Sequence, residues 1–197
     1  MKILDNINHT VREDLQDTMQ KGSRVSIAAA CFSIYAYQEL KKQLEEIAEL
    51  RFIFTSPTFV QENTPKERRE FYIPKLTREK SLYGTEFEVR LRNELTQKAL
   101  AKECADWVRR KVKFRSNVSG EQMPGFMTVG ESSYMPISGF TTVDLGCERG
   151  NNAYYPVQRT ETFENGRYFL SLFDEIWNDS SRLQDVTDIV LQSISTA

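Results

Sequence analysis

The stretch that decides the fold is "RVSIAAACFSI", residues 24–34, which is apolar almost throughout and shows no polar alternation. Such a run predicts a strand that is buried on both faces, as strands are when helices cover both sides of a sheet. Apolar residues at helical spacing follow over residues 35–48, and "LRFIFT" (residues 50–55) predicts a second buried strand. A strand, a helix and a strand in succession indicate a crossover unit of the α/β class.

The same patterns predict the rest of the chain on either side of this unit. Periodic apolar residues predict four further segments to be helical: residues 3–19, 86–110, 162–177 and 182–197. Alternation or short apolar runs predict strands at residues 111–118, 125–131, 133–140 and 153–159. Residues 56–85 show no sustained period, and residues 144–152 form a loop rich in Gly and Asn. The last helix has no stop signal, so we expect the polypeptide to continue beyond Ala197.

The composition excludes several classes of protein. A chain of 197 residues is long enough for one domain and short for two, and 40% hydrophobic residues is too high for intrinsic disorder. No apolar stretch approaches the roughly 20 residues that cross a bilayer, and the polar N-terminus is not typical of a signal peptide. We therefore expect a cytoplasmic protein without a membrane partner. Widely spaced cysteines (Cys31, Cys104 and Cys147) and a single histidine exclude a standard structural zinc site and predict reduced, mostly buried thiols.

The positive charges are unevenly distributed. Of the 26 Lys and Arg residues, 21 precede position 114, and the last 84 residues contain five arginines, no lysine and no histidine. Two basic clusters are candidates for DNA contact, one in the irregular central region and one at the end of the long helix. Their members are Lys66, Arg68, Arg69, Lys75, Arg78 and Lys80, and Arg109, Arg110, Lys111, Lys113 and Arg115. Phe71 and Tyr72 lie within the first cluster and could stack on bases. The alternative is a solvated surface, because three glutamates dilute the first cluster and cations often end helices.

Three stretches resemble one family. "NINHTVREDLQDTMQKGSRVSIAAACFSIYAYQEL" (residues 6–40) resembles the opening of the phospholipase D-like domains at the N-terminus of bacterial Swi/Snf-type helicases of superfamily 2. "SGFTTVDLG" (residues 138–146) resembles the second half of the phospholipase D signature. "RYFLSLFDEIWNDSSRLQDVTDIVLQSI" (residues 167–194) is similar to the helical linker that joins such a domain to the helicase motor. The resemblance implies a phospholipase D-like mixed sheet flanked by helices over residues 1–160, and a helical C-terminal extension over residues 161–197.

The residues that give this family its activity are missing. The family uses a histidine–x–lysine motif on one strand and an asparagine after the next, so that a histidine attacks phosphorus and lysine and asparagine hold the anionic oxygens. In the matching register Phe126 and Thr128 stand for the histidine and lysine. Within the signature turn formed by Ser138, Gly139, Phe140 and Thr141, Gly139 stands for the asparagine. No histidine or lysine follows Lys113, and His9, predicted on the first helix, is the only histidine. We therefore expect no catalytic residues, metal or cofactor in this domain.

The resemblance implies an ATP-dependent DNA helicase or translocase of which this chain is an inactive accessory domain. Its expected partners are DNA, the protein's own helicase region and a second copy, with which the apolar segment 126–140 would form a dimer interface. The chain has no G-x-x-x-x-G-K-[ST] loop, so ATP would bind in the missing region. Two alternatives remain: an active phosphodiesterase or nuclease of the same family, and a protein-interaction module that does not bind nucleic acid.

Overall fold

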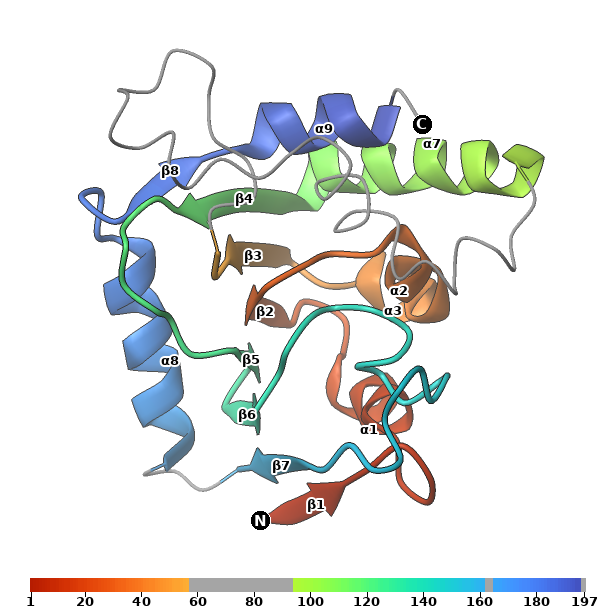
Figure 1. Ribbon diagram of the computed structural model, residues 1–197, viewed down its shortest axis with the longest axis vertical. Helices are drawn as coiled ribbons and strands as arrows, with labels where there is room; N and C mark the ends of the chain where they lie inside the picture. Colours follow the sequence, from red (N-terminus) through yellow and green to blue (C-terminus); the bar gives the residue numbers. More distant parts are fainter. Residues whose placement is uncertain (57–93, 162–164, 196–197) are drawn as a thin grey trace.

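The computed structural model describes residues 1–56, 94–161 and 165–195, and these residues form one mixed β-sheet with helices on both faces (Figure 1). The spatial order of the strands is β1-β7-β6-β5-β2-β3-β4-β8. The strands are β1 (Lys2–Leu4), β2 (Arg24–Ala29), β3 (Glu49–Phe54), β4 (Val112–Asn117), β5 (Phe126–Val129), β6 (Ser132–Met135), β7 (Val157–Thr160) and β8 (Leu183–Asp185). The predicted α/β class with a mixed sheet is confirmed.

Helices separate the strands that run parallel. Strand β2 pairs in parallel with β3 and β3 with β4, whereas every other neighbouring pair in the sheet is antiparallel. The helices of the described residues are α1 (Val11–Thr18), α2 (Ile34–Glu39), α3 (Lys41–Leu44), α7 (Glu94–Lys111), α8 (Asn165–Trp177) and α9 (Thr187–Ser195). Helices α2 and α3 connect β2 to β3, and α7 leads into β4, as parallel pairing requires.

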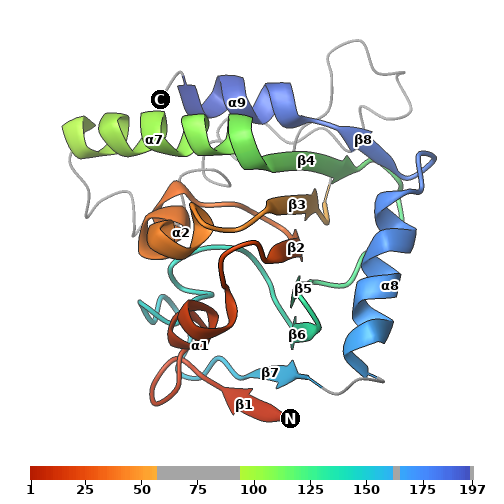
Figure 2. The ribbon, with the colours of Figure 1, turned by 180° about the vertical axis from the view of Figure 1, so that it is seen from behind.

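The helices divide unequally between the two faces. Figure 1 shows α8 alone on one side of the sheet and α1, α2 and α3 on the other, and Figure 2 shows the same layers from behind. Helices α7 and α9 lie side by side near β4 and belong to the same core as α1 and α2. One large core therefore forms under five helices, and a smaller core forms under α8.

Strand β2 contributes to both cores, as its continuous apolar pattern predicted. Ile27 belongs to the large core and its neighbour Ala28 to the small one, and neither is more than 1% exposed. The centre of the large core is aromatic: the Phe32 ring centroid lies 5.6 Å from that of Phe52 and 5.3 Å from that of Phe114. Burial of apolar area on both faces fixes β2 at the middle of the sheet.

The predicted helix over residues 3–19 is wrong in its first half. Residues 2–4 form β1, which pairs antiparallel with β7, and the helix begins only at Val11. The Asp5 carboxylate accepts hydrogen bonds from the backbone N–H groups of the next residues, Ile7, Asn8 and His9, and Thr10 caps α1 through the N–H of Glu13. Local side-chain capping and a strand partner 155 positions away therefore override the helical spacing.

The C-terminal extension is not wholly helical. Residues 182–197 were predicted as one helix, but Leu183–Asp185 form β8, which pairs antiparallel with β4, and α9 begins at Thr187. The Asp185 carboxylate accepts the N–H of Thr187, and the Thr187 hydroxyl accepts the N–H of Phe114, so this turn is tied to β4. Residues 183–195 are thus part of the same sheet and core as the strands before residue 160.

Smaller departures concern the other helices and strands. The helix predicted over residues 35–48 is split into α2 and α3 at Leu40. The strand predicted at residues 153–159 begins only at Val157, and the long helix predicted from residue 86 is described from Glu94 onward. No helix within residues 1–56, 94–161 and 165–195 has the length and apolar character to cross a bilayer.

Candidate functional site

The two positions that match the family's histidine and lysine lie on β5 beneath α8. Phe126 is 0% exposed and Thr128 is 1% exposed, and as alternate residues of one strand they face the same side of the sheet. The Phe126 ring centroid lies 5.6 Å from that of Phe169 and 6.0 Å from that of Phe173, both on α8. Aromatic carbon therefore fills the space beside Phe126 on this face of the sheet.

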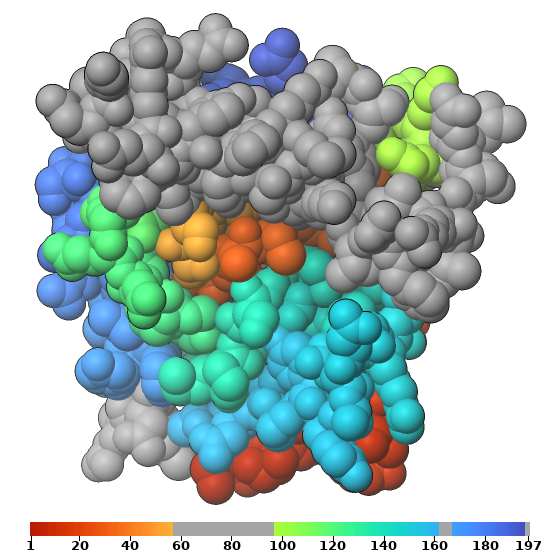
Figure 3. Space-filling model, in the orientation of Figure 1, coloured from red at the N-terminus to blue at the C-terminus, as the bar shows by residue number. Residues whose placement is uncertain are grey.

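The signature turn lies beside the C-terminal end of β2. The Ala30 N–H donates to the carbonyl of Ser138 (2.8 Å), and the Phe140 N–H donates to the carbonyl of Cys31 (2.8 Å). In Figure 3 the loop between β6 and β7, in teal to cyan, covers the surface between the orange residues around β2 and β3 and the red N-terminal residues. The structure thus brings residues 138–141 next to the central strand, although Phe140 and Thr141 are themselves buried.

Gly139, which stands at the asparagine position, has no room for a side chain. A Cβ atom there would lie 2.5 Å from Cys31 Sγ and 2.8 Å from an oxygen of Asp144. Both distances are far below van der Waals contact, so glycine is required by the two side chains that already occupy the place. The position is closed by packing as well as by its residue type.

Asp144 is held by groups from its own loop. One carboxylate oxygen accepts from the Thr141 hydroxyl (2.6 Å) and the Thr141 N–H (3.2 Å), and the other accepts from the Tyr155 hydroxyl (2.5 Å). Burial and the Asp144 carboxylate raise the pKa of Tyr155 to about 12, so the phenol is neutral at pH 7 and acts as a donor. These bonds fix the loop and leave Asp144 occupied rather than facing a substrate.

His9 does not lie on a helix as predicted. It is exposed in the turn that precedes α1, where its carbonyl accepts the N–H of Asp5 (2.7 Å). The next residue, Thr10, packs near Gly146 at the end of the signature loop. No second histidine exists in the chain with which His9 could share acid–base work.

The described residues contain no cluster of three or more His, Cys, Asp or Glu side chains that could bind a metal ion. The expectation that the thiols are mostly buried is wrong, because only Cys104 is buried, whereas Cys31 is half-buried and Cys147 is exposed. Burial raises the pKa of the Cys104 thiol, which makes it unreactive.

The first basic cluster, Lys66 to Lys80, lies outside the described residues. The second cluster is described in full, and most of its side chains are used within the molecule. Arg110 forms an ion pair with Glu45 (2.7 Å), and Lys111 donates to the carbonyls of Glu45 and Ile47. Arg115 donates to the carbonyl of Trp177 and lies over its ring. These three cations hold helices and strands together.

Lys113, Arg109 and Arg110 are the exposed members of this cluster, and Arg110 is the one paired with Glu45. Lys113 is exposed on β4 and forms no ion pair within the described part of the chain. Arg109 is half-exposed, pairs with Asp106 three residues earlier (2.8 Å), and approaches the Ser195 hydroxyl of α9 at 3.5 Å. A DNA surface built from residues 109–115 would therefore depend on three exposed side chains rather than five, and two of these three already form ion pairs.

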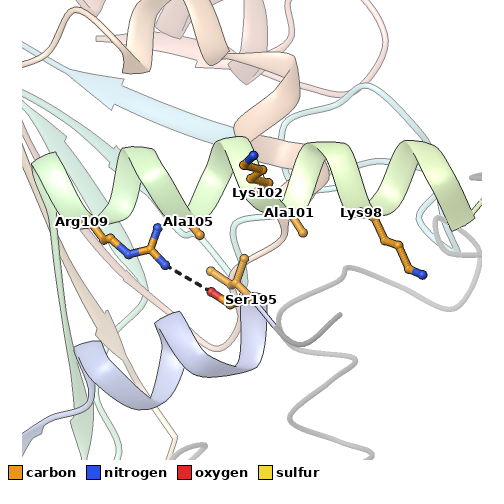
Figure 4. A pocket seen from close by; sticks show the side chains of 7 residues that line it. Lys98, Ala101, Lys102, Ala105, Arg109 and Ser195 are labelled. Atoms are coloured by element: carbon orange, nitrogen blue, oxygen red, sulfur yellow. Dashed lines mark hydrogen bonds between the residues drawn. The ribbon is translucent and has the colours of Figure 1, made fainter.

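Sequence patterns did not reveal a groove between α7 and α9. Its volume is about 400 Å³, and its lining residues are Lys98, Ala101, Lys102, Ala105, Arg109, Ile194 and Ser195. Figure 4 shows Ser195 facing the part of α7 that carries Ala101 and Ala105, with Arg109 on one side and Lys98 on the other. The lining contains three cations and no carboxylate. Their spacing of four and seven residues along α7 places all three on one helix face, which is a signal that the sequence does contain.

A buried charge cluster was also missed. Asp14 is 3% exposed on α1 and accepts hydrogen bonds from Arg159 (2.6 Å), Tyr134 (2.7 Å) and Lys2 (3.0 Å). Desolvation pushes the pKa of Asp14 up, but these three donors outweigh it, and the net pKa lies below the ordinary value. Because the donors come from β7, β6 and β1, the cluster ties α1 to one end of the sheet.

No protein-family model matches the chain, and no curated protein matches it significantly.

Proposed function

We propose that this chain is a catalytically inactive, phospholipase D-like domain that contributes DNA contact to a helicase or translocase. The observation that carries the proposal is the state of the three signature positions. Phe126 and Thr128 are buried beneath α8, and Gly139 is enclosed by Cys31 and Asp144. A domain that keeps the turn of a hydrolase but fills its catalytic positions with packed side chains is suited to binding rather than chemistry.

The arrangement of the sheet supports the phospholipase D-like part of the proposal. The strand that matches the histidine–x–lysine strand, β5, pairs with the central strand β2, and the signature turn returns to the end of that same strand. The Ile137 N–H donates to the carbonyl of Gly125 (3.0 Å), so the residue before the turn contacts the residue before β5. The helicase context rests on the resemblance of the first and last stretches of the sequence.

Charge supports the DNA-contact part. Most cations precede position 114, and among the described ones Lys98, Lys102 and Lys113 are exposed. Ammonium groups on a surface neutralise backbone phosphates and release counterions, which gives weak binding that depends on salt.

The experiment compares hydrolysis and binding by the purified 197-residue chain. We expect no turnover of phosphodiesters or DNA above background, together with DNA binding that weakens as salt is raised. Metal-independent turnover that disappears in a His9→Ala variant would favour the active phosphodiesterase instead. Failure to bind DNA at low salt would favour the protein-interaction module.

Self-association stays a prediction of the resemblance. Its physical ground was that residues 126–140 would expose apolar surface, but Phe126, Met127, Tyr134 and Phe140 are all buried within the single chain. Light scattering at micromolar concentration tests the dimer, and a mass near 22.9 kDa would contradict it.

A further inference from the structure

We infer that the groove between α7 and α9 binds the phosphodiester backbone of single-stranded DNA, an inference that rests on the proposed function and names its contact surface. The groove brings Lys98, Lys102 and Arg109, which are four and seven residues apart on α7, to one strip of surface. Three cations without a carboxylate in the same lining create a local positive potential that attracts phosphate.

The floor of the groove suits a chain that lies close to the helix. Among the residues that line the groove, Ala101 and Ala105 lie between the cations on α7, and both are buried. Their methyl groups let a ligand approach the α7 backbone more closely than longer side chains would. Ile194 of α9 also borders the groove, but it is 0% exposed and therefore supports the floor from below. The groove therefore combines charge at its edges with a floor of small side chains, and the charged edges correspond to the positive groove with which nonspecific single-strand sites follow the backbone.

The Arg109 side chain can be recruited by phosphate at low cost. The ion pair between Arg109 and Asp106 joins two groups that are each more than half exposed, 53% and 57%, and such pairs contribute little. The contact between Arg109 and the Ser195 hydroxyl is long, at 3.5 Å. Glu103, the other nearby acid on α7, is engaged with Lys41 of α3, so it does not cancel the charge of Lys102.

The size of the groove favours one strand over a duplex. A volume of about 400 Å³ lies near the lower end of the range of roughly 300–1,000 Å³ that ligand pockets span. It can hold one or two nucleotides in a narrow cleft, whereas a duplex presents its phosphates across a wide convex surface. The competing explanation is that the cations balance the partial negative charge at the C-terminus of α9.

The test compares two triple variants of the full chain with the same loss of charge. The first, Lys98→Gln/Lys102→Gln/Arg109→Gln, removes the groove cations, and the second, Lys21→Gln/Lys42→Gln/Arg149→Gln, removes exposed cations elsewhere. Binding of a fluorescently labelled oligothymidylate is measured from 20 to 200 mM salt. If the groove contacts three phosphates, the groove variant should lose at least tenfold in affinity at low salt, and its log–log salt slope should fall by about 2. The matched variant should retain nearly the wild-type values.

The outcomes separate this inference from the proposed function. Wild-type binding that both variants retain equally would overturn the groove and leave DNA contact standing. Equal losses in both variants would mean general charge rather than a site. A groove variant that melts at lower temperature but binds as wild type would show that the cations serve α9 alone. Stronger binding of duplex than of oligothymidylate would contradict the single-strand assignment. A wild-type chain that binds neither would overturn the proposed DNA contact itself.

Discussion

The guanidinium of Arg115 lies 4.1 Å from the centroid of the Trp177 ring and also donates a hydrogen bond to the carbonyl of the same residue. A second cation, Arg51 on the neighbouring strand, lies 4.9 Å from the ring centroid of Phe173 and pairs with Asp174 at 2.8 Å. Helix α8 is thus attached to the sheet by two stacked arginines as well as by apolar packing. A residue type that suggested DNA contact serves instead to hold a helix in place.

Replacing Arg115 with Gln should lower the free energy of unfolding by about 1–2 kcal/mol, because the cation–π contact and the donor to the Trp177 carbonyl are lost together. Urea denaturation followed by tryptophan fluorescence measures the change. The control is Lys113→Gln, two residues away on the same strand, which should change stability by less than about 0.5 kcal/mol. Equal effects of the two substitutions would show that charge alone, and not the stacking, matters at Arg115.

Introducing the histidine and lysine of the phospholipase D motif on β5 should not create phosphodiesterase activity. The double variant Phe126→His/Thr128→Lys places a polar ring and an ammonium where the native side chains are at most 1% exposed. We expect the free energy of unfolding to fall by about 3 kcal/mol or more, because aromatic packing is lost and a cation is buried without a partner. The conservative variant Phe126→Leu should remain folded and serves as the control for packing alone. A double variant with wild-type stability and new phosphodiesterase turnover would show that the site is latent rather than closed.

Gly139→Ala should destabilise the chain by about 1–3 kcal/mol because its methyl group would overlap Cys31 Sγ and Asp144. Cys31→Ala removes the nearer of the two obstacles. The double variant should therefore be more stable than the sum of the single losses predicts, with a coupling of at least about 0.5 kcal/mol. A double-mutant cycle in urea gives this coupling directly. Strict additivity would mean that Cys31 moves aside freely and that only Asp144 limits position 139.

The Asp14 cluster should make stability depend on acid. Because the pKa of folded Asp14 is lowered, its stabilisation is fully present above the unfolded value of about 3.9 and is lost as the pH falls through the folded value. At pH 7 we expect Asp14→Asn to lower the free energy of unfolding by about 3–5 kcal/mol, since Arg159 and Lys2 lose their buried partner. The difference from wild type should shrink below pH 4. Asp17→Asn, exposed on the same helix, should show no such convergence. If the difference in unfolding free energy between wild type and Asp14→Asn is constant from pH 7 to pH 3, the charge of Asp14 does not stabilise the fold.

The central part of the fold could be predicted because its signal is local. The apolar run at residues 24–34 and the alternation around Phe114 are recorded in the sequence itself, and β2, β3 and β4 lie where these patterns place them. The edge strands β1 and β8 could not be predicted, because each has three residues and each is defined by its partner. Helical spacing over residues 3–19 was overridden by the pairing of Lys2 with Arg159, which no local pattern contains.

The candidate site could likewise be predicted only in part from the sequence. That Phe126, Thr128 and Gly139 lack the required chemistry could be read from residue types alone. That the same positions are also closed by α8, Cys31 and Asp144 needed the tertiary structure, because α8 lies some 40 residues further along the chain. The basic cluster at residues 109–115 illustrates the opposite error. Sequence counts charges but does not show that Arg110 is already paired with Glu45.

The pairing of β1 with β7 has a consequence for the synthesis of the protein. Strand β1 has no partner until residues 157–160 have also emerged from the ribosome, so this edge of the sheet cannot close while the roughly 150 residues between the two strands are being synthesised. Until then Leu4, which is 0% exposed in the folded chain, lacks its pairing partner Val157. Folds with such distant pairings acquire their native contacts late and slowly, and their exposed apolar segments are typical clients of chaperones in the meantime.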